Sequence, residues 1–147
     1  MPDALSLREV TQANLRAICD LEVAPNQRDY VAPNVFSIAQ AYVEPRAWPR
    51  AIYAGETPVG FVMLHEDPET GRYFLWRLMI DRRYQRNGYG RAALDLVVGH
   101  VRGLPSATEL RSSYVAGDGS PSNFYRAYGF VETGEHEHDE VVIRLAL

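Results

Sequence analysis

The sequence contains a single cysteine, Cys19, among its 147 residues. It therefore excludes an intramolecular disulfide and a zinc cluster built from cysteines. No apolar run approaches the roughly 20 residues that a membrane-spanning helix needs, and the first ten residues lack the basic and apolar regions of a signal peptide. We therefore expect a cytoplasmic protein with no membrane partner.

An excess of positive charge is also missing. The formal net charge is −4 at pH 7, whereas a nucleic-acid-binding surface is typically a basic stripe. We therefore expect no nucleic-acid partner. The length and the 46% hydrophobic content are typical of one globular domain with one core, so residues 1–147 are treated as a single domain.

A glycine-bearing loop stands between an apolar strand and an apolar helix. Residues 73–80 (YFLWRLMI) predict a buried strand, and residues 92–101 carry apolar side chains at helical spacing. In the loop between them, Gly88 and Gly90 remove the side chains that would keep a phosphate away from the backbone. The N–H groups at a helix start and nearby arginines attract anions. We interpret this loop as a phosphate-binding site.

The loop differs from the two common nucleotide-binding fingerprints. It lacks the Lys-Ser/Thr pair of a Walker loop and the third glycine of a dinucleotide-binding turn. Its pattern Gln-x-x-Gly-x-Gly, after a strand ending in Leu-Met-Ile-Asp, resembles the pyrophosphate loop of the GNAT superfamily of N-acetyltransferases. Residues 124–130 (FYRAYGF) resemble a second GNAT segment, Tyr-x-x-x-Gly-Phe. Ser120-Pro121 predicts the start of a helix there, and Gly129 its end.

The order of the remaining expected elements agrees with that resemblance across essentially the whole chain. They are a strand at 5–10, a helix capped by Thr11, a loop at 24–34, a helix at 35–43, strands at 51–54 and 59–66, a helix at 88–101, a strand at 110–115, a loop at 117–119, and strands at 130–133 and 141–147. The resemblance implies an α/β (α+β) GNAT fold. In it, a single twisted mixed sheet of about seven strands is flanked by about four helices and splayed at the CoA-binding strands.

The resemblance also implies the chemistry. The acetyl group of acetyl-CoA, a co-substrate, passes to a primary amine by direct attack within a ternary complex. The N–H of Leu78 faces the thioester oxygen, Ile80 pairs with the pantetheine amides, and Tyr125 supplies a proton to the departing thiolate, whereas Tyr128 is expected in the core. The residues expected to contact acetyl-CoA are Leu78, Met79, Ile80, Gln85, Arg86, Asn87, Gly88, Tyr89, Gly90, Arg91, Asn123 and Arg126. The family pattern has an asparagine seven residues before the tyrosine, where this chain has Asp118.

The general base stays open, because residues 73–80 contain no carboxylate where many family members have a glutamate. A chain of ordered waters is one alternative. The side chains that are candidates are Glu22, Asp29, His65, Glu66 and Asp67.

The acceptor is predicted from a less specific resemblance. Residues 23–34 and 37–41 are similar to the branch of diamine or spermine/spermidine N-acetyltransferases. A polycation would be bound by carboxylates and aromatic faces, and the substrate-binding residues we expect are Glu22, Asp29, Tyr30 and Arg77. Arg77 has two interpretations: an outward-pointing residue at the splayed strand, or a counter-charge for an acceptor carboxylate or an acidic base.

Two other functions remain open. One is the same chemistry on an amino acid, an aminoglycoside-like compound or a peptide N-terminus, for which Arg77 and Arg28 would bind a carboxylate. The other is a catalytically weak acetyl-CoA-binding module. Tyr125 argues against this module, because a pure binder needs no proton donor at the sulfur.

The acidic run at 135–140 contains His136 and His138, which would share one face of a strand. Without a third well-spaced ligand we expect a solvated hairpin turn here, and no metal site. Many family members pair through their C-terminal strands, so a homodimer is the expected assembly.

Overall fold

A seven-stranded mixed β-sheet runs through the molecule in the computed structural model, which describes residues 4–147. In chain order the elements are β1 (Leu5–Arg8), α1 (Leu15–Asp20), the 3-10 helix η1 (Pro25–Gln27), α2 (Asn34–Val43), β2 (Ala47–Ala54), β3 (Thr57–Asp67), β4 (Arg72–Ile80), α3 (Tyr89–Arg102), β5 (Glu109–Val115), α4 (Ser122–Tyr128), β6 (Val131–Glu137) and β7 (Glu140–Ala146). The strands are ordered β1-β2-β3-β4-β5-β7-β6. Only β4 and β5 pair in parallel.

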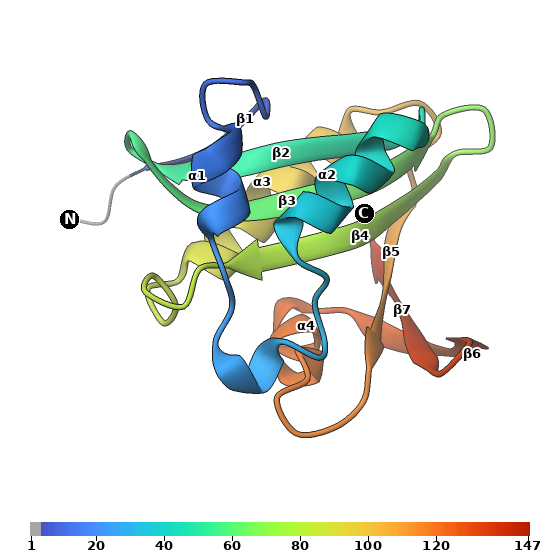
Figure 1. Cartoon of the computed structure of the whole chain (residues 1–147). Coiled ribbons are helices and arrows are strands. Elements are labelled where there is room, and N and C mark those ends of the chain that lie inside the picture. Colours follow the sequence, from blue (N-terminus) through green and yellow to red (C-terminus); the bar gives the residue numbers. More distant parts are fainter. Residues whose placement is uncertain (1–3) are drawn as a thin grey trace.

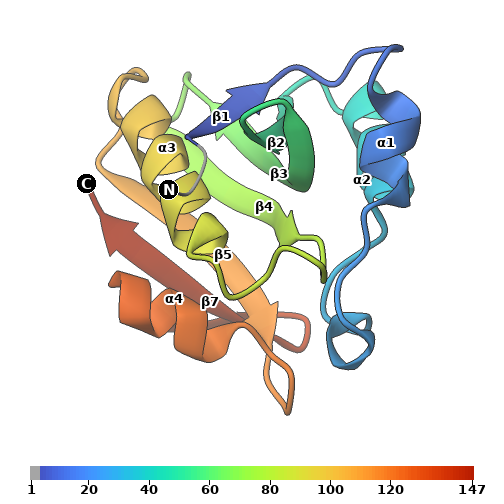
Figure 2. The same ribbon diagram turned by 90° about the vertical axis from the view of Figure 1, so that its left-hand side faces the viewer.

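Helices cover both faces of the sheet, as Figure 2 shows, with α3 and α4 on one side and α1 and α2 on the other. The strand residues alternate between these faces, so the sheet contributes to two apolar cores. The larger core packs the sheet against α3 and α4, and includes Leu64, Leu75, Leu94 and Val97. The smaller one packs the sheet against α1 and includes Ile18, Phe61 and Met79. The sheet is therefore a rigid platform between two helical layers.

The pairing of β4 with β5 is short. The two strands are in register only at Phe74–Arg111 and Leu75–Ser112, and they separate beyond these residues (Figure 1). The hydroxyl of Ser112 donates a 2.8 Å hydrogen bond to the Leu75 carbonyl at this point. The splayed sheet that the resemblance implied is therefore present, with Ser112 at its apex.

The GNAT architecture expected from the sequence is confirmed, but some boundaries differ. β2 begins at Ala47, four residues before the expected strand, although it contains Pro49. β1 pairs only with residues 51–54 of β2, so on that edge the proline, which has no N–H, lies beyond the end of β1. On its other edge Pro49 lies opposite Met63 of β3. β6 extends through the acidic run to Glu137, and the turn lies at 138–139.

The start of the first helix was predicted wrongly. Thr11 does not cap it, because α1 begins only at Leu15. Asn14 occupies the cap position, and its side-chain oxygen accepts a 2.7 Å hydrogen bond from the Thr11 N–H. The polar residues 11–14 thus form a side-chain-closed turn, in competition with a helical turn.

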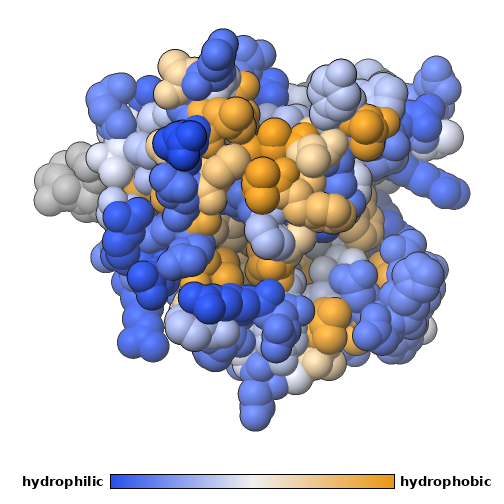
Figure 3. Space-filling model, viewed as in Figure 1, coloured by the Kyte–Doolittle hydropathy of each residue, from blue (hydrophilic) through white to orange (hydrophobic). Residues whose placement is uncertain are grey.

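The apolar side chains on the surface gather on α2. Val35, Phe36 and Val43 are all exposed there, and Figure 3 shows hydrophobic surface over this helix. The outward residues of the edge strand β6 are mostly polar by comparison. No helix within residues 4–147 is long and apolar enough to cross a membrane.

Candidate active site

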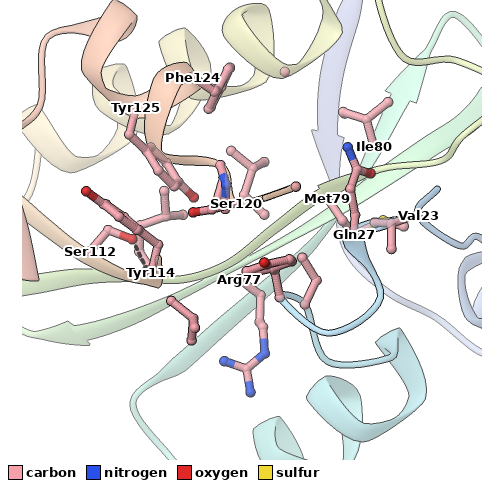
Figure 4. Close-up of a pocket in the computed structure, with 18 of the residues that line it drawn as sticks. Val23, Gln27, Arg77, Met79, Ile80, Ser112, Tyr114, Ser120, Phe124 and Tyr125 are labelled. Carbon is pink, nitrogen blue, oxygen red and sulfur yellow. Dashed lines mark hydrogen bonds between the residues drawn. The ribbon is translucent and has the colours of Figure 1, made fainter. Parts of the chain in front are cut away.

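A cavity of about 850 Å³ opens where β4 and β5 separate. Its wall comes from the α1–α2 loop, the end of β4, the loop before α3, the end of β5, the start of α4 and the β6–β7 turn. Figure 4 shows side chains from β4, β5 and α4 around this space. The splay thus brings segments that are far apart in the sequence to one site.

The free edge of β4 presents backbone donors to this cavity. The N–H of Asp81 donates to the Val59 carbonyl at 2.8 Å, on the β3 side. Successive N–H groups of a strand point to opposite edges, so those of Leu78 and Ile80 face away from β3. On that edge β5 has already diverged. Within residues 4–147 both N–H groups are therefore available to a ligand lying between the strands, and their contacts with acetyl-CoA stay a prediction.

The loop before α3 ends in a bare helix start. Gly88 is the N-cap residue with a φ of 78°, a left-handed conformation that glycine adopts without strain, and no side chain caps the helix. A Cβ at Gly90 would lie 3.2 Å from the Phe124 ring, so glycine also permits α3 to approach α4. The first N–H groups of α3 thus lie at the cavity with no side-chain cap, an arrangement suited to an anion.

Gln85 holds this loop in place. Its Nε2 donates to the Ile80 carbonyl at 2.9 Å and to the Gln27 side chain at 2.8 Å. One residue of the motif therefore joins the end of β4, the loop and η1. Gln85 lines the cavity as well, so it combines a structural role with its predicted place in the site.

The charges beside the loop are guanidinium groups. Arg86 and Arg91 both line the cavity. All fifteen basic side chains of the chain are arginines, and none is a lysine. A guanidinium stays charged at any physiological pH and matches the geometry of a phosphate, so this end of the cavity is permanently cationic.

Tyr125 brings a phenol to the apex of the splay. It is 7% exposed and lies edge-on to Phe124 and Phe130, with ring centroids 5.3 Å away in each case. Burial raises the pKa of Tyr125 to about 12, although a hydrogen bond with Ser112 opposes the rise. The phenol therefore keeps its proton and can act as a donor. Its role as the acid of the reaction stays a prediction.

The α1–α2 loop forms a further part of the cavity wall. Its Tyr30 hydroxyl donates to the Asp118 carbonyl, on the loop before α4. Asp118 therefore acts through its backbone here, at the position where the family pattern has an asparagine. Asp29 and Tyr30 line the cavity, and their predicted role in binding the acceptor stays a prediction.

Arg77 reaches the cavity from β4 on the α2 side (Figure 4). Its Nη2 donates to the Gln40 side chain and its Nη1 to the Trp76 carbonyl, both at 3.0 Å. Its Nε is buried without a hydrogen-bond partner. Desolvation lowers the pKa of Arg77, and the charge of Glu140 partly offsets this. Arg77 is therefore a half-buried cation with no carboxylate within 4.0 Å among residues 4–147.

Most of the candidate bases lie elsewhere. Glu66 contacts His100 at 2.6 Å, and His65 lies 3.7 Å from Glu44. Asp67 lies 3.7 Å from Arg46. None of these three candidates lines the cavity. They stand at the far end of β3, where their charges are already partnered.

Several predicted contact residues are also outside the cavity wall. Glu22 forms ion pairs with Arg28 and Arg82, at 4.0 and 3.4 Å. The Asn87 side chain donates to the Tyr84 carbonyl, and Arg126 donates to Asn123 on the exposed side of α4. Roles for Glu22, Asn87, Asn123 and Arg126 in binding therefore stay predictions without support from this cavity.

Residues that the sequence analysis did not predict for the site complete it. They are Ser112, Ser113 and Tyr114 of β5, and Asp139 and Glu140 at the β6–β7 turn. Glu140 was expected in a solvated turn, whereas it is half-buried at the start of β7. No local pattern marks these positions, because the pairing of β5 with β7 brings them to the cavity.

The sequence pattern described as the Acetyltransferase (GNAT) family matches residues 15–130. The chain belongs to the GNAT acetyltransferase family. It is therefore an acetyl-CoA-dependent N-acetyltransferase. Among similar proteins is the spermine/spermidine N(1)-acetyltransferase of Bacillus subtilis (strain 168), which is 29% identical over 138 residues, or 90% of this chain and 91% of that one.

Solved structures share this GNAT fold. An acetyltransferase from Thermus thermophilus has a TM-score of 0.72 at 21% identity, covering 98% of this chain and 97% of that chain. The PaiA N-acetyltransferase of Thermoplasma acidophilum, in complex with coenzyme A, has a TM-score of 0.69 at 15% identity, covering 97% and 99%. In this GNAT chain the free edge of β4, the bare start of α3 and the two arginines fit the amides and the pyrophosphate of a CoA molecule.

Proposed function

We propose that this enzyme transfers the acetyl group of acetyl-CoA to a primary amine of a small molecule, and that polyamines are among its acceptors. One observation carries the proposal. The free N–H groups of β4, the bare start of α3 and the buried phenol of Tyr125 border a single cavity. The lining of this cavity also contains three carboxylates, which are suited to an ammonium group.

Two observations support a polyamine as the acceptor. The Bacillus subtilis relative carries the name spermine/spermidine N(1)-acetyltransferase. The cavity lining contains the carboxylates of Asp29, Asp139 and Glu140, together with the ring of Tyr30. Carboxylates and aromatic faces are the groups that bind extended polycations.

The proposed reaction is direct attack of the amine within a ternary complex. The Leu78 N–H stabilises the negative charge that develops on the thioester oxygen, because a preorganised donor costs no reorganisation during the reaction. Tyr125 donates its proton to the thiolate as the carbon–sulfur bond breaks. Both groups are held by regular elements, β4 and α4, at the same cavity.

The release of free CoA from acetyl-CoA, measured against a panel of amines, tests this proposal. The panel contains spermidine, spermine, putrescine, amino acids and aminoglycosides. Preferential turnover of the polyamines is the expected result. The absence of turnover with every amine, while acetyl-CoA still binds, would instead favour a catalytically weak acetyl-CoA-binding module.

Arg77 favours a second class of acceptor. Its buried Nε has no partner, and an unpaired charged donor in a cavity is a site for an anionic group. An amine that also carries a carboxylate would supply this group. Turnover of amino acids alone in the same panel would select this alternative over polyamines.

The cytoplasmic location and the homodimer through the C-terminal strands stay predictions. The edge strand β6 exposes Glu132, Glu135 and Glu137, so it offers little apolar surface for such a contact. Sedimentation velocity at several protein concentrations would test the dimer.

A further inference from the structure

The amine acceptor must lose a proton before it can attack, because an alkyl amine is an ammonium ion at pH 7. Three carboxylates line the cavity: those of Asp29, Asp139 and Glu140. Each could therefore meet the acceptor. The three carboxylates differ in their burial and in the elements that hold them.

Glu140 is the carboxylate on a fixed element. It is the first residue of β7 and pairs in register with Val115 at the end of β5. Asp29 and Asp139 are exposed and lie in turns, whereas Glu140 is half-buried. The hydroxyl of Ser113 also donates a 3.3 Å hydrogen bond to Oε1 of Glu140. A base needs a defined position relative to the reacting nitrogen, and Glu140 has the best-defined one of the three.

Arg77 of β4 lines the same cavity as Glu140 but does not pair with it. The two charges are close enough for Glu140 to influence the pKa of Arg77, but their charged atoms are not within 4.0 Å of one another. Because Glu140 forms no ion pair with Arg77, its carboxylate stays free to bind another charged group.

We propose that Glu140 binds the ammonium group of the acceptor and takes its proton, a role that rests on the proposed acetyl transfer. The family's usual position for a glutamate base, on the strand before the phosphate loop, has no carboxylate in this chain. Glu140 supplies one from β7, two strands away from β4 in the sheet.

The proton and electron changes balance as follows. The Glu140 carboxylate accepts one proton of the ammonium ion, and the freed lone pair of nitrogen forms the bond to the carbonyl carbon. The carbon–sulfur bond breaks, and the sulfur takes the proton of Tyr125. The surplus proton on nitrogen passes through water to restore Tyr125, and Glu140 releases its own proton to solvent. One acetyl amide, one thiol and one proton are formed.

A pair of matched acceptors tests this role. The first is the alkyl amine that the wild-type enzyme turns over best. The second is its alkoxyamine analogue, in which oxygen replaces the methylene next to the amino group, so that the amine is neutral at pH 7. The variant is Glu140→Gln, and the control is Glu137→Gln, because Glu137 faces Glu140 across the β6–β7 hairpin but is exposed and outside the cavity.

The expected result is a loss specific to the charged acceptor. In Glu140→Gln, kcat/KM should fall about 100-fold for the alkyl amine and less than about threefold for the alkoxyamine, since no ammonium has to be bound or deprotonated. Glu137→Gln should retain wild-type values with both acceptors. Turnover of the alkoxyamine shows at the same time that the variant is folded and binds acetyl-CoA.

Two results would overturn the role of Glu140: an equal loss with both acceptors, or no loss with either. A failure of the proposed function is seen separately, because the wild-type enzyme would then acetylate no amine at all. Glu140→Asp provides a second check, since it keeps the charge with one methylene less. It should therefore retain more activity on the alkyl amine than Glu140→Gln.

Discussion

Tyr125 shows how burial prepares a single side chain for one step. Its phenol is 7% exposed among aromatic rings, and its raised pKa keeps it protonated. A proton donor to a thiolate must be neutral before the reaction, so the apolar surroundings suit the role proposed for Tyr125. The same hydroxyl contacts Ser112, the residue at the apex of the splay.

The first prediction concerns this hydroxyl. Tyr125→Phe removes the proton donor but keeps the ring, so kcat should fall about 100-fold while the affinity for acetyl-CoA is unchanged. Tyr128→Phe is the control, because Tyr128 lies on the same helix and donates to Asp95 at 2.7 Å, away from the apex. Steady-state kinetics and calorimetry measure the two quantities. Unchanged turnover in Tyr125→Phe would exclude Tyr125 as the acid.

Alkaline pH should destabilise the fold through the same residue. The pKa of Tyr125 is about 12 in the folded protein, above the ordinary value of 10.0. Its stabilisation is therefore complete below pH 10 and is lost as the pH rises toward 12, by up to roughly 3 kcal/mol. Thermal unfolding at pH 9 to 11.5 would show a smaller decline in Tyr125→Phe than in wild type. An equal decline in the thermal stability of Tyr125→Phe and wild type would contradict the raised pKa of Tyr125.

At the scale of the element, β4 can present the edge proposed to bind acetyl-CoA because β3 fixes its other edge. Gly60 of β3 lies opposite Ile80, and a Cβ at Gly60 would come within 2.3 Å of the Met79 carbonyl. The close approach of the two backbones is thus possible only with glycine at this position. It sets the position of the strand whose opposite edge faces the cavity.

Gly60→Ala should therefore damage both stability and binding. We expect a loss of about 2 kcal/mol or more in the free energy of unfolding, together with weaker acetyl-CoA binding as β4 shifts. Gly99→Ala is the matched control, because a Cβ at Gly99 meets nothing within 4 Å. In the last turn of α3 it should stabilise the protein by up to about 0.5–1 kcal/mol. Urea unfolding of both variants measures these changes. If Gly60→Ala left the free energy of unfolding unchanged, the proposed close contact between β3 and β4 would be contradicted.

Sequence patterns predicted those elements whose signals are local. The loop at 85–91 and the tyrosine of α4 carry turn, cap and spacing signals within a few residues, and both line the cavity. The start of β2 was missed because Pro49 argues against a strand unless the extent of β1 is known. Glu140 was missed because only the pairing of distant strands brings it to the site. Long-range pairing, in contrast to local propensity, cannot be read from a window of sequence.

At the scale of the whole molecule, the buried side chain of Asp81 links segments that are far apart in the sequence. It is 1% exposed and accepts hydrogen bonds from the Glu22 N–H at 2.9 Å and from the Arg83 N–H and Nε, at 3.0 and 2.8 Å. The end of β4, the phosphate loop and the start of the α1–α2 loop therefore meet at one carboxylate. Both walls of the cavity depend on it.

Asp81→Asn should loosen this junction. Burial alone would raise the pKa of Asp81, but the hydrogen bonds from Arg83 and Glu22 hold it below the ordinary 3.8. Its stabilisation is thus present above pH 3.8 and is lost as the pH falls through the folded value. We expect the variant to lose about 3 kcal/mol at pH 7. The gap to wild type in urea unfolding should narrow in acid, and a gap independent of pH would contradict an ionic role.

Because arginine takes the place of lysine throughout the chain, the enzyme cannot acetylate its own side chains. A guanidinium is not an acceptor for an amine acetyltransferase, and the chain has no lysine. N-acetyl-lysine therefore cannot accumulate on the protein, however long it stands with its acetyl donor. The same composition makes its side chains inert to amine-directed crosslinkers and fluorophores. Such reagents can modify an acceptor or a partner protein in a mixture while leaving every side chain of this enzyme without a label.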